Sequence, residues 1–544
     1  MLEFLKALRF EGAGASCVLV RGASRCILVF GILWLGILLL AASGVQAQTN
    51  EEINAGLQFS FTPPGARSLG MGGAFSGLAD DATAAYANPA GLIWISRSEV
   101  SIEGRYRNYT TRYPYSGSAS FSPTGNGIDT RPDLEFRDFD SDVSGLSFLS
   151  YAHVFGDRWR VAIYRHELAA FRADLESEGP FIRNGGDGTP AEQSRLRSRL
   201  SPLRGDLSLD IVNLGLSVAY RAHETLWLGL GVSRYAFDYR ARTTRFEVNS
   251  DFRFGGLSRV SFDPADFSPA NETEKSFQDG DDDDLAVIAG LIYKARSNKW
   301  GLGLVYRQAP EFDLDYRYEW GARRFARRDE TGNENYVDPG VVRALTGTTE
   351  FGVPEMISLG FMWKPTQSLT LSFEYARIDY SALEPEANLI SSALRGSPVP
   401  GTSQDLSVDS CGEYTLDGRR YPIDTDPRTE VPCIANAVGV NFKVEDGDEF
   451  HLGLEYVLPR ARPIALRFGV WHDPDHQLTY DFGDRTPEEV GGPVDRFAFR
   501  FAPGQDEWHV AGGLGIVFGQ VQFDIAADVS ERAEILSFSS VYRF

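Results

Sequence analysis

Residues 369–376, Leu-Thr-Leu-Ser-Phe-Glu-Tyr-Ala, decide the fold class of this chain. Apolar or aromatic side chains occupy the odd positions, and polar or small side chains occupy the even positions. A β-strand sends successive side chains to opposite faces, so this stretch has one apolar face and one mixed face. Residues 450–456 and 464–470 repeat the alternation. We therefore interpret the chain as all-β.

The connections between the predicted strands alternate between short and long. Short turns are expected at 156–157, 222–223, 297–298, 365–366, 459–461 and 518–519, and the last connection of the other series, near 530–533, is also short. Long connections are expected at 110–142, 169–205, 241–284, 317–350, 381–447 and 474–505. Transmembrane barrels combine short periplasmic turns with long outer loops, and only a closed barrel satisfies the strand backbone in lipid. Residues 96–544 are thus predicted to form a transmembrane antiparallel β-barrel of about fourteen strands with long extracellular loops.

Both ends of the chain indicate export to the bacterial outer membrane. Cationic residues precede an apolar run at 26–40, and Val45-Gln46-Ala47 has the small-x-small form of a cleavage site. We expect residues 1–47 to be a signal peptide, although an uncleaved anchor remains an alternative. The last strand ends with Tyr542 and Phe544, which resembles the signal read by the barrel assembly machinery. The expected surroundings are outer-membrane lipid and lipopolysaccharide.

Composition excludes some partners and indicates a compartment. The formal net charge is −22, which argues against nucleic acid. It fits either adaptation to high salt or acidic outer loops. Cys411 and Cys433 remain after the signal, and an oxidising compartment would join them in a disulfide. Two free thiols are the alternative.

Residues 48–95 differ from the rest of the chain. They are rich in glycine and alanine, which suits a compact plug within a narrow lumen. The stretch from Asp80 to Tyr86 predicts a short helix, and Asn88-Pro89 ends it. We expect a small N-terminal hatch in the barrel lumen.

This segment resembles the hatch of the FadL/TodX family of outer-membrane transporters of long-chain fatty acids and hydrocarbons. The matching elements are Asp80-Asp81-Ala82 and Asn88-Pro89-Ala90 in the hatch, 289–293 and 300–307 in a middle hairpin, and 353–356 in the next. The resemblance implies ligand-gated passive diffusion of hydrophobic small molecules through a monomeric barrel without a cofactor. It places Asn88, Pro89 and Ala90 in the hatch near an inner site. We expect Asp80, Asp81, Asn88, Pro89 and Ala90 to act in the hatch and in ligand gating.

Two other functions remain open. PorV-like relatives share the N-terminal pattern, so the chain could be an outer-membrane component of a protein secretion system. A general diffusion pore is the third alternative.

No catalytic pattern is present: the sequence has neither Gly-x-Ser-x-Gly nor His-Glu-x-x-His, so we expect no enzyme. His472-Asp473-Pro474-Asp475-His476 could ligate a metal, but a solvated loop is the favoured interpretation. Asp279 and 281–284 could bind Ca²⁺ or form a solvated acidic run at the end of a loop. We predict no metal site.

Strand parity makes two further predictions. Charged residues are expected to face a wet lumen, where they form salt bridges to the hatch or a polar gate: Glu374, Glu455, Arg467, Asp524, Asp528 and Arg543. The apolar positions change from odd to even within 207–218, and from even to odd within 226–239. Such a change indicates either a bulge that could open the barrel wall or a switch at the membrane edge.

Overall fold

The computed structural model describes most of the chain after residue 55, all of it within the compact unit Gln46–Phe544. The described residues are 56–58, 60–117, 133–183, 197–199, 202–246, 250–251, 259–260, 265–321, 326–328, 334–336, 342–383, 407–410, 413–416, 419–422, 441–481 and 504–544. The predicted signal peptide, Cys411 and Cys433 lie outside them.

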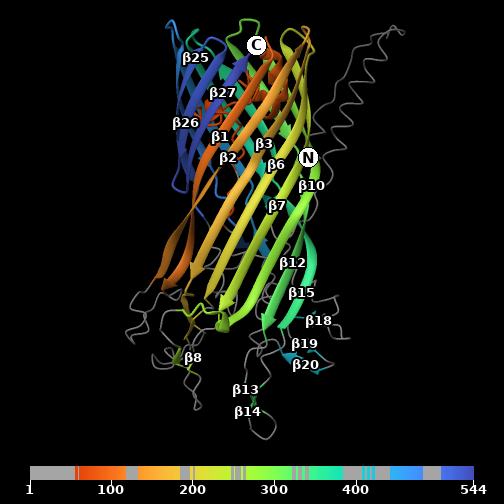
Figure 1. The fold of residues 1–544 in the computed structure, drawn as a ribbon, viewed down its shortest axis with the longest axis vertical. Helices are drawn as coiled ribbons and strands as arrows, with labels where there is room; N and C mark the ends of the chain where they lie inside the picture. The colour runs from red at the N-terminus through yellow and green to blue at the C-terminus, as the bar shows by residue number, and fades with distance from the viewer. Residues whose placement is uncertain are drawn as a thin grey trace, which may run out of the picture. The chain divides into compact units, whose positions relative to one another are not determined.

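Antiparallel strands close into a barrel (Figure 1). The main sheet of the described residues has 16 strands, and pairing between β10 and β11 closes it. Two of these strands, β12 (Glu311–Gly321) and β15 (Val342–Gly352), continue β11 and β16 outward, so 14 strands form the wall. The predicted fold class is confirmed. The wall strands are β1 Glu99–Gly117, β2 Leu134–Phe155, β3 Trp159–Ser177, β6 Leu203–Arg221, β7 Leu226–Phe246, β10 Glu272–Lys294, β11 Trp300–Arg307, β16 Glu355–Trp363, β17 Leu369–Asp379, β22 Gly447–Leu458, β23 Ile464–Asp473, β25 Glu507–Phe518, β26 Val521–Val529 and β27 Ala533–Arg543.

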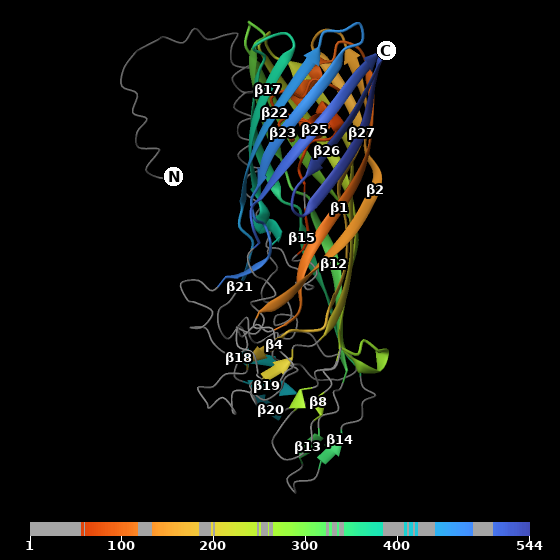
Figure 2. The same ribbon diagram turned by 90° about the vertical axis from the view of Figure 1, so that its left-hand side faces the viewer.

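Six short turns gather at the end of the barrel that carries the C-terminus, and the strand ends that lead into the long connections lie at the other end, together with the turn at 530–532 (Figures 1 and 2). Several strands between β1 and β15 run well beyond the apolar belt on the long-connection side, so they are longer than the sequence predicted. Small elements accompany the outer connections and strand ends: β4 Phe181–Arg183, β5 Arg197–Arg199, β8 Ser250–Asp251, β9 Arg259–Val260, η3 Pro269–Asn271, β13 Ala326–Arg328, β14 Glu334–Tyr336, η4 Tyr380–Leu383, β18 Ser407–Ser410, β19 Glu413–Leu416, β20 Arg419–Pro422, β21 Asn441–Lys443 and β24 Thr479–Asp481.

An exposed apolar belt surrounds the half of the barrel next to the short turns. Leu214, Leu230 and Phe538 are 62%, 62% and 54% exposed, as expected for side chains that face hydrocarbon. None of the helices among the described residues has the length and apolar character to span a bilayer.

The two predicted phase changes are not bulges. In β6 and β7 the odd residues point inward along the whole strand. Leu228 and Leu230 face outward within the belt, whereas Tyr235 and Phe237 face inward beyond it. The apolar side chains therefore change face where the strands leave the belt.

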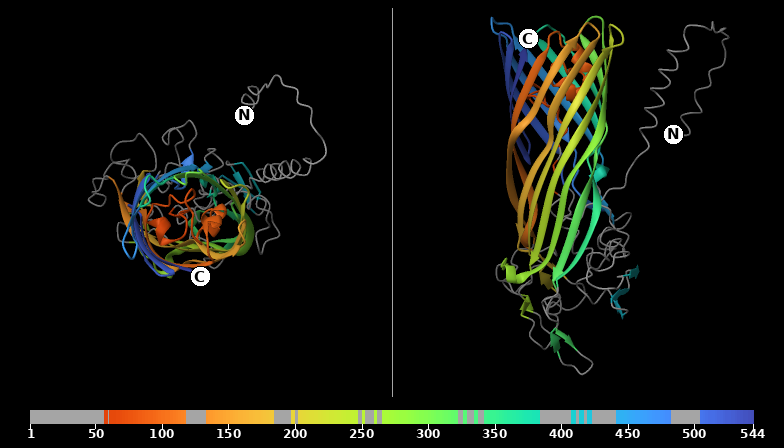
Figure 3. Two further views of the ribbon diagram at one scale, coloured as in Figure 1. Left: turned by 90° about the horizontal axis from the view of Figure 1, so that it is seen from above. Right: turned by 45° about the vertical axis from the view of Figure 1, so that its right-hand side comes forward.

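Residues 61–95 lie inside the barrel, as the view along its axis shows (Figure 3). They form α3 (Ala66–Leu69), α4 (Ala84–Ala87) and η2 (Pro89–Trp94), joined by tight turns. The predicted helix is shorter than expected, because a turn precedes Ala84. Wall glycines allow close packing: a Cβ on Gly303 would lie 2.1 Å from Ser76 O, and one on Gly469 would lie 2.1 Å from Gly72 N. We call residues 61–95 the luminal segment.

Candidate functional site

Asn88 fixes the luminal segment to the wall between β7 and β10. Its side chain is fully buried and donates from Nδ2 to Ser76 O at 2.8 Å, while its Oδ1 accepts from Ala90 N at 3.1 Å. Gly290 on β10 lies so close that an added Cβ would be 2.1 Å from Asn88 Oδ1. Pro89 and Ala90 contact Gly229 on β7 in the same way. These residues make one docked turn.

Asp80 and Asp81 lie next to Arg67, which belongs to the same luminal segment. Arg67 contacts the carboxylate of Asp80, lies 3.6 Å from Asp81, and binds Glu455 with its Nε and Nη2 at 2.9 and 3.0 Å. Glu455 on β22 also accepts from Arg467 at 2.8 Å. Burial raises the pKa of Asp81, and Asp80 raises it further, although Arg67 and the bonds from Thr83 oppose this. The charge network thus couples the segment to the wall.

Two wall carboxylates bind backbone N–H groups of the luminal segment. Glu374 on β17 accepts from Phe75 N and Ser76 N, both at 2.8 Å, and from Ser76 Oγ at 2.6 Å. Glu103 on β1 accepts from Gly65 N at 2.8 Å. Both carboxylates are buried, and if the segment moved Glu374 would lose three charge-assisted bonds and Glu103 would lose one.

Other inward charges predicted from strand parity are found in the lumen. Arg467 also binds Asp524 at 2.7 Å, Asp528 is fully buried, and Arg543 binds Glu99 at 2.9 Å. His451 places Nδ1 2.7 Å from Gly72 O and Nε2 3.0 Å from Glu449. These contacts link β22, β23, β26 and β27 to the lumen interior.

A buried arginine lies next to the luminal segment, and no carboxylate of the described residues pairs with it. Arg307 on β11 is 4% exposed, and its guanidinium lies 4.2 Å from the centre of the Tyr86 ring. Its hydrogen bonds reach only Met356 S and Tyr86 O, each at 3.5 Å. Within the described part of the chain, Arg307 Nε and His166 Nδ1 have no hydrogen-bond partner, and the Tyr86 hydroxyl and the Asn213 amide have none within 3.5 Å. The lumen therefore contains a desolvated cation amid unsatisfied polar groups.

The wall separates between β2 and β3. These strands pair only from Phe155↔Trp159 to Phe148↔His166. Beyond that point β2 continues beside β1 and β3 continues beside β6, with register shifts at Glu103/Gly104 and Glu167/Ala169. Figure 1 shows the outer parts of β1 and β2 bending away from the barrel.

Charged and aromatic side chains cover this separation from within. Glu167 on β3 binds Arg107 on β1 at 2.7 Å and approaches the backbone of Gly145 on β2. Behind them, the ring centroids of His166 and Tyr86 are 4.0 Å apart. The separation thus adjoins the unsatisfied cluster around Arg307.

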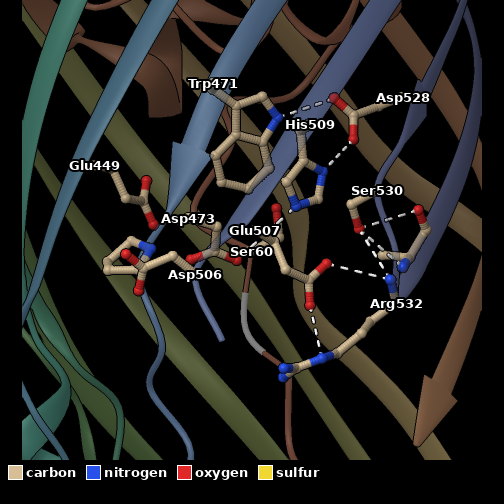
Figure 4. Close-up of polar contacts among 12 residues, drawn as sticks. Ser60, Glu449, Trp471, Asp473, Asp506, Glu507, His509, Asp528, Ser530 and Arg532 are labelled. Carbon is tan, nitrogen blue, oxygen red and sulfur yellow. Dashed lines mark hydrogen bonds and ion pairs between the residues drawn. The ribbon is translucent and has the colours of Figure 1, made fainter. Parts of the chain in front are cut away.

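A cavity at the outer end of the lumen combines apolar and titratable side chains, among them Leu57, Tyr109, Glu507, His509 and Ile535. His509 Nδ1 lies 2.6 Å from Asp528, which also accepts from Trp471 Nε1 at 2.9 Å (Figure 4). The rings of Trp471 and His509 stack with centroids 3.8 Å apart.

The possible metal ligands of the outer loops have protein partners. His472 and Asp506 are 3.3 Å apart, and His476 and Asp473 are 3.5 Å apart. In the part of the chain that the structure describes, no group of three His, Cys, Asp or Glu residues could hold a metal ion.

The prediction that the acidic run ends a loop is wrong, because Asp279 and 281–284 lie on β10. Asp283 binds Arg234 at 2.7 Å, while Asp282 and Asp284 accept from Asp313 N and Glu311 N at 2.8 and 3.0 Å. These carboxylates occupy the break where β10 passes from β11 to β12.

The sequence thus identified the docked turn, the acidic pair and the inward carboxylates, but not Glu103, Arg307 or the Arg107–Glu167 pair. Parity on 97–109 could have placed Glu103 inward. Nothing in one strand reveals that Arg307 lacks a partner, because its partners would come from other strands.

Comparisons with known proteins agree with this architecture. Residues 201–401 match the profile of a family described as outer membrane protein transport protein (OMPP1/FadL/TodX). A Pseudomonas aeruginosa FadL homologue of known structure is 13% identical, with 90% of this chain and 100% of that chain covered and a TM-score of 0.51. The Ralstonia pickettii toluene transporter TbuX is 14% identical over 89% and 99% of the two chains, with a TM-score of 0.47. No curated protein matches the sequence.

Proposed function

Because residues 201–401 match the profile of the OMPP1/FadL/TodX family, we propose that this chain is a transporter of the FadL/TodX type that carries long-chain amphipaths inward by ligand-gated passive diffusion. The observation that carries this proposal is the barrel's filled lumen, with a separation of the wall beside a buried polar cluster. We propose no catalytic step.

Residues 48–95 act in this proposal as the hatch. The contacts of Asn88, Glu374 and Glu103 support this role, because they tie the luminal segment to β10, β17 and β1. A ligand can shift the segment only if it binds the moved state better than the docked state. A shift of the segment would rearrange the ion pairs that Arg67 forms with Asp80 and Asp81.

The separation between β2 and β3 is the proposed lateral exit. Unpaired strand edges cannot be left in hydrocarbon, so this opening must lie in protein, water or the headgroup region. Leu146 and Leu149 are exposed on its outer side, and the Arg107–Glu167 pair closes it within. Breaking that pair would open a path from lumen to membrane.

Arg307 supports an anionic substrate over a neutral hydrocarbon. A buried guanidinium without a carboxylate has a large desolvation cost, which a bound carboxylate would offset by charge-assisted bonds. The apolar tail would gain about 25 cal/mol for each Å² that it removes from water. Long-chain fatty acids have both parts and are therefore the proposed substrates.

The test is uptake of a labelled long-chain fatty acid by cells that depend on this barrel. A Gly145→Cys/Glu167→Cys variant, bridged by a short thiol crosslinker, closes the proposed exit. Its matched control is Tyr151→Cys/Ile163→Cys, which bridges positions already paired in the same two strands. Uptake should fall at least about tenfold in the first variant alone. Equal uptake in both would exclude the lateral route, while wild-type cells without uptake would exclude the transport function.

A further inference from the structure

The short turns of the barrel carry an excess of positive charge in an acidic protein. Turns at 156–158, 221–225, 294–299, 364–368 and 459–463 contain eight Lys or Arg residues and two acids, a formal charge of +6 against −22 for the whole chain. We call these five turns the cationic rim. Its basic residues are Arg158, Arg221, Lys294, Arg296, Lys299, Lys364, Arg460 and Arg462.

No rim cation forms an ion pair within 4.0 Å among the described residues, although the half-buried Lys294 interacts with the charge of Asp80. Arg158, Arg296, Lys299, Arg460 and Arg462 are exposed. Arginines at the opposite end behave differently. Four of them form ion pairs with acids of the chain: Arg204 with Glu176, Arg234 with Asp283, Arg317 with Glu319 and Arg377 with Asp446. The charge of the exposed rim cations is therefore left for an external anion.

Aromatic side chains fix the depth of these cations in the membrane. Trp159, Trp300 and Trp363 are 48%, 36% and 45% exposed, and each directly follows or precedes a rim cation. The guanidinium of Arg462 lies 5.0 Å from the centre of the Phe518 ring, which is itself 42% exposed. Aromatic girdles mark the boundary of the hydrocarbon, so cations beside them reach the phosphate level.

We propose that the cationic rim binds the head groups of anionic phospholipids in the inner leaflet of the outer membrane. Lipid fits better than an acidic protein, because the charges are distributed over five turns around the barrel instead of gathering on one face. Their neighbours also face the lipid. The rim sets the depth of the barrel and enriches anionic lipid around its short turns, independently of the cargo.

Lipid selectivity of the full-length barrel in phosphatidylcholine vesicles tests this. Electron spin resonance of spin-labelled phosphatidylglycerol and phosphatidylcholine gives their relative association with the barrel. Wild-type protein should prefer phosphatidylglycerol about threefold to tenfold at low salt, and the preference should fall as salt is added. Arg158→Gln/Lys299→Gln/Arg460→Gln/Arg462→Gln should reduce it to about one.

The matched control removes the same charge from the other end: Arg204→Gln/Arg234→Gln/Arg317→Gln/Arg377→Gln. It should keep the wild-type preference, and heat-dependent gel mobility verifies that both variants are folded barrels. A rim variant that retains the preference overturns the proposal, as does wild-type protein without one. Loss of a bound acidic periplasmic protein with unchanged lipid selectivity would assign the rim to that partner instead.

Discussion

Asn88 and Gly290 fit together so closely that any side chain larger than hydrogen at position 290 would displace the amide. An added Cβ would lie 2.1 Å from Asn88 Oδ1, a separation that real Cβ atoms do not show. The surface of β10 at Gly290 is therefore complementary in shape to the docked turn of the luminal segment.

Gly290→Val should release this turn while leaving the barrel assembled, because valine suits a strand but not the space beside Asn88. Asn88→Ala should also destabilise the docked turn, but less, by about 1–3 kcal/mol, because the buried hydrogen bonds of the amide are lost. We expect reduced fatty-acid uptake in both, with normal heat-dependent mobility on gels. Gly512→Val is the control, because a Cβ added at Gly512 meets no atom within 4 Å. Wild-type uptake by Gly290→Val would argue against the docked turn.

Glu374→Gln should loosen the hatch. The carboxylate accepts three short bonds from Phe75 and Ser76, and a neutral amide makes weaker bonds and can orient one donor toward the backbone N–H groups. The substitution should reduce the stability of the docked hatch by about 2–4 kcal/mol. Planar bilayers would report this as frequent open bursts in an otherwise closed barrel. Arg317→Gln, at the outer extension, should stay closed, and a closed Glu374→Gln barrel would contradict the expected role.

The alternation of side chains along each strand was enough to predict which residues face the lumen. Once Leu371 and Phe373 face lipid, Glu374 must face the lumen, and the same rule places Glu455 and Arg467. The acidic run on β10 was misassigned because aspartate is disfavoured in strands. That strand extends beyond the belt into water, where Asp282 and Asp284 bind the backbone N–H groups of β12.

The alternation of side chains could not predict the separation between β2 and β3 or the unpaired Arg307. The separation of β2 from β3 arises from irregular register near Ser147 and Leu168, and neither position breaks an obvious sequence pattern. Arg307 is the last residue of a strand with ordinary alternation. Only the closed barrel shows that the described residues around it include no carboxylate partner.

Arg307→Met should separate stability from transport. Methionine removes the buried charge and keeps much of the volume, so the unliganded barrel should become more stable by about 1–3 kcal/mol. Uptake of a fatty acid should fall at least about tenfold, because the carboxylate loses its cation. Uptake of a neutral long-chain alcohol should change little. Thermal denaturation in detergent and the two uptake assays measure these effects, and equal loss for both cargoes would contradict carboxylate recognition.

His476 should make the outer mouth sensitive to alkaline pH. Burial lowers the pKa of this imidazole, but Asp473 and Pro474 O outweigh burial and raise it from 6.5 to about 9. The protonated ring stacks on Tyr380 with centroids 4.4 Å apart and also faces Glu449. Since the folded pKa exceeds the unfolded value, the stabilisation is complete below pH 6.5 and is lost as pH rises through about 9.

The shift corresponds to a contribution on the order of 3 kcal/mol. His476→Gln should therefore melt earlier than wild type at pH 6, and the difference should shrink to almost nothing above about pH 9. His223→Gln, on an exposed short turn, is the control and should show no such trend. A melting difference that does not change between pH 6 and pH 10 would mean that His476 acts by packing on Tyr380 and not by its charge.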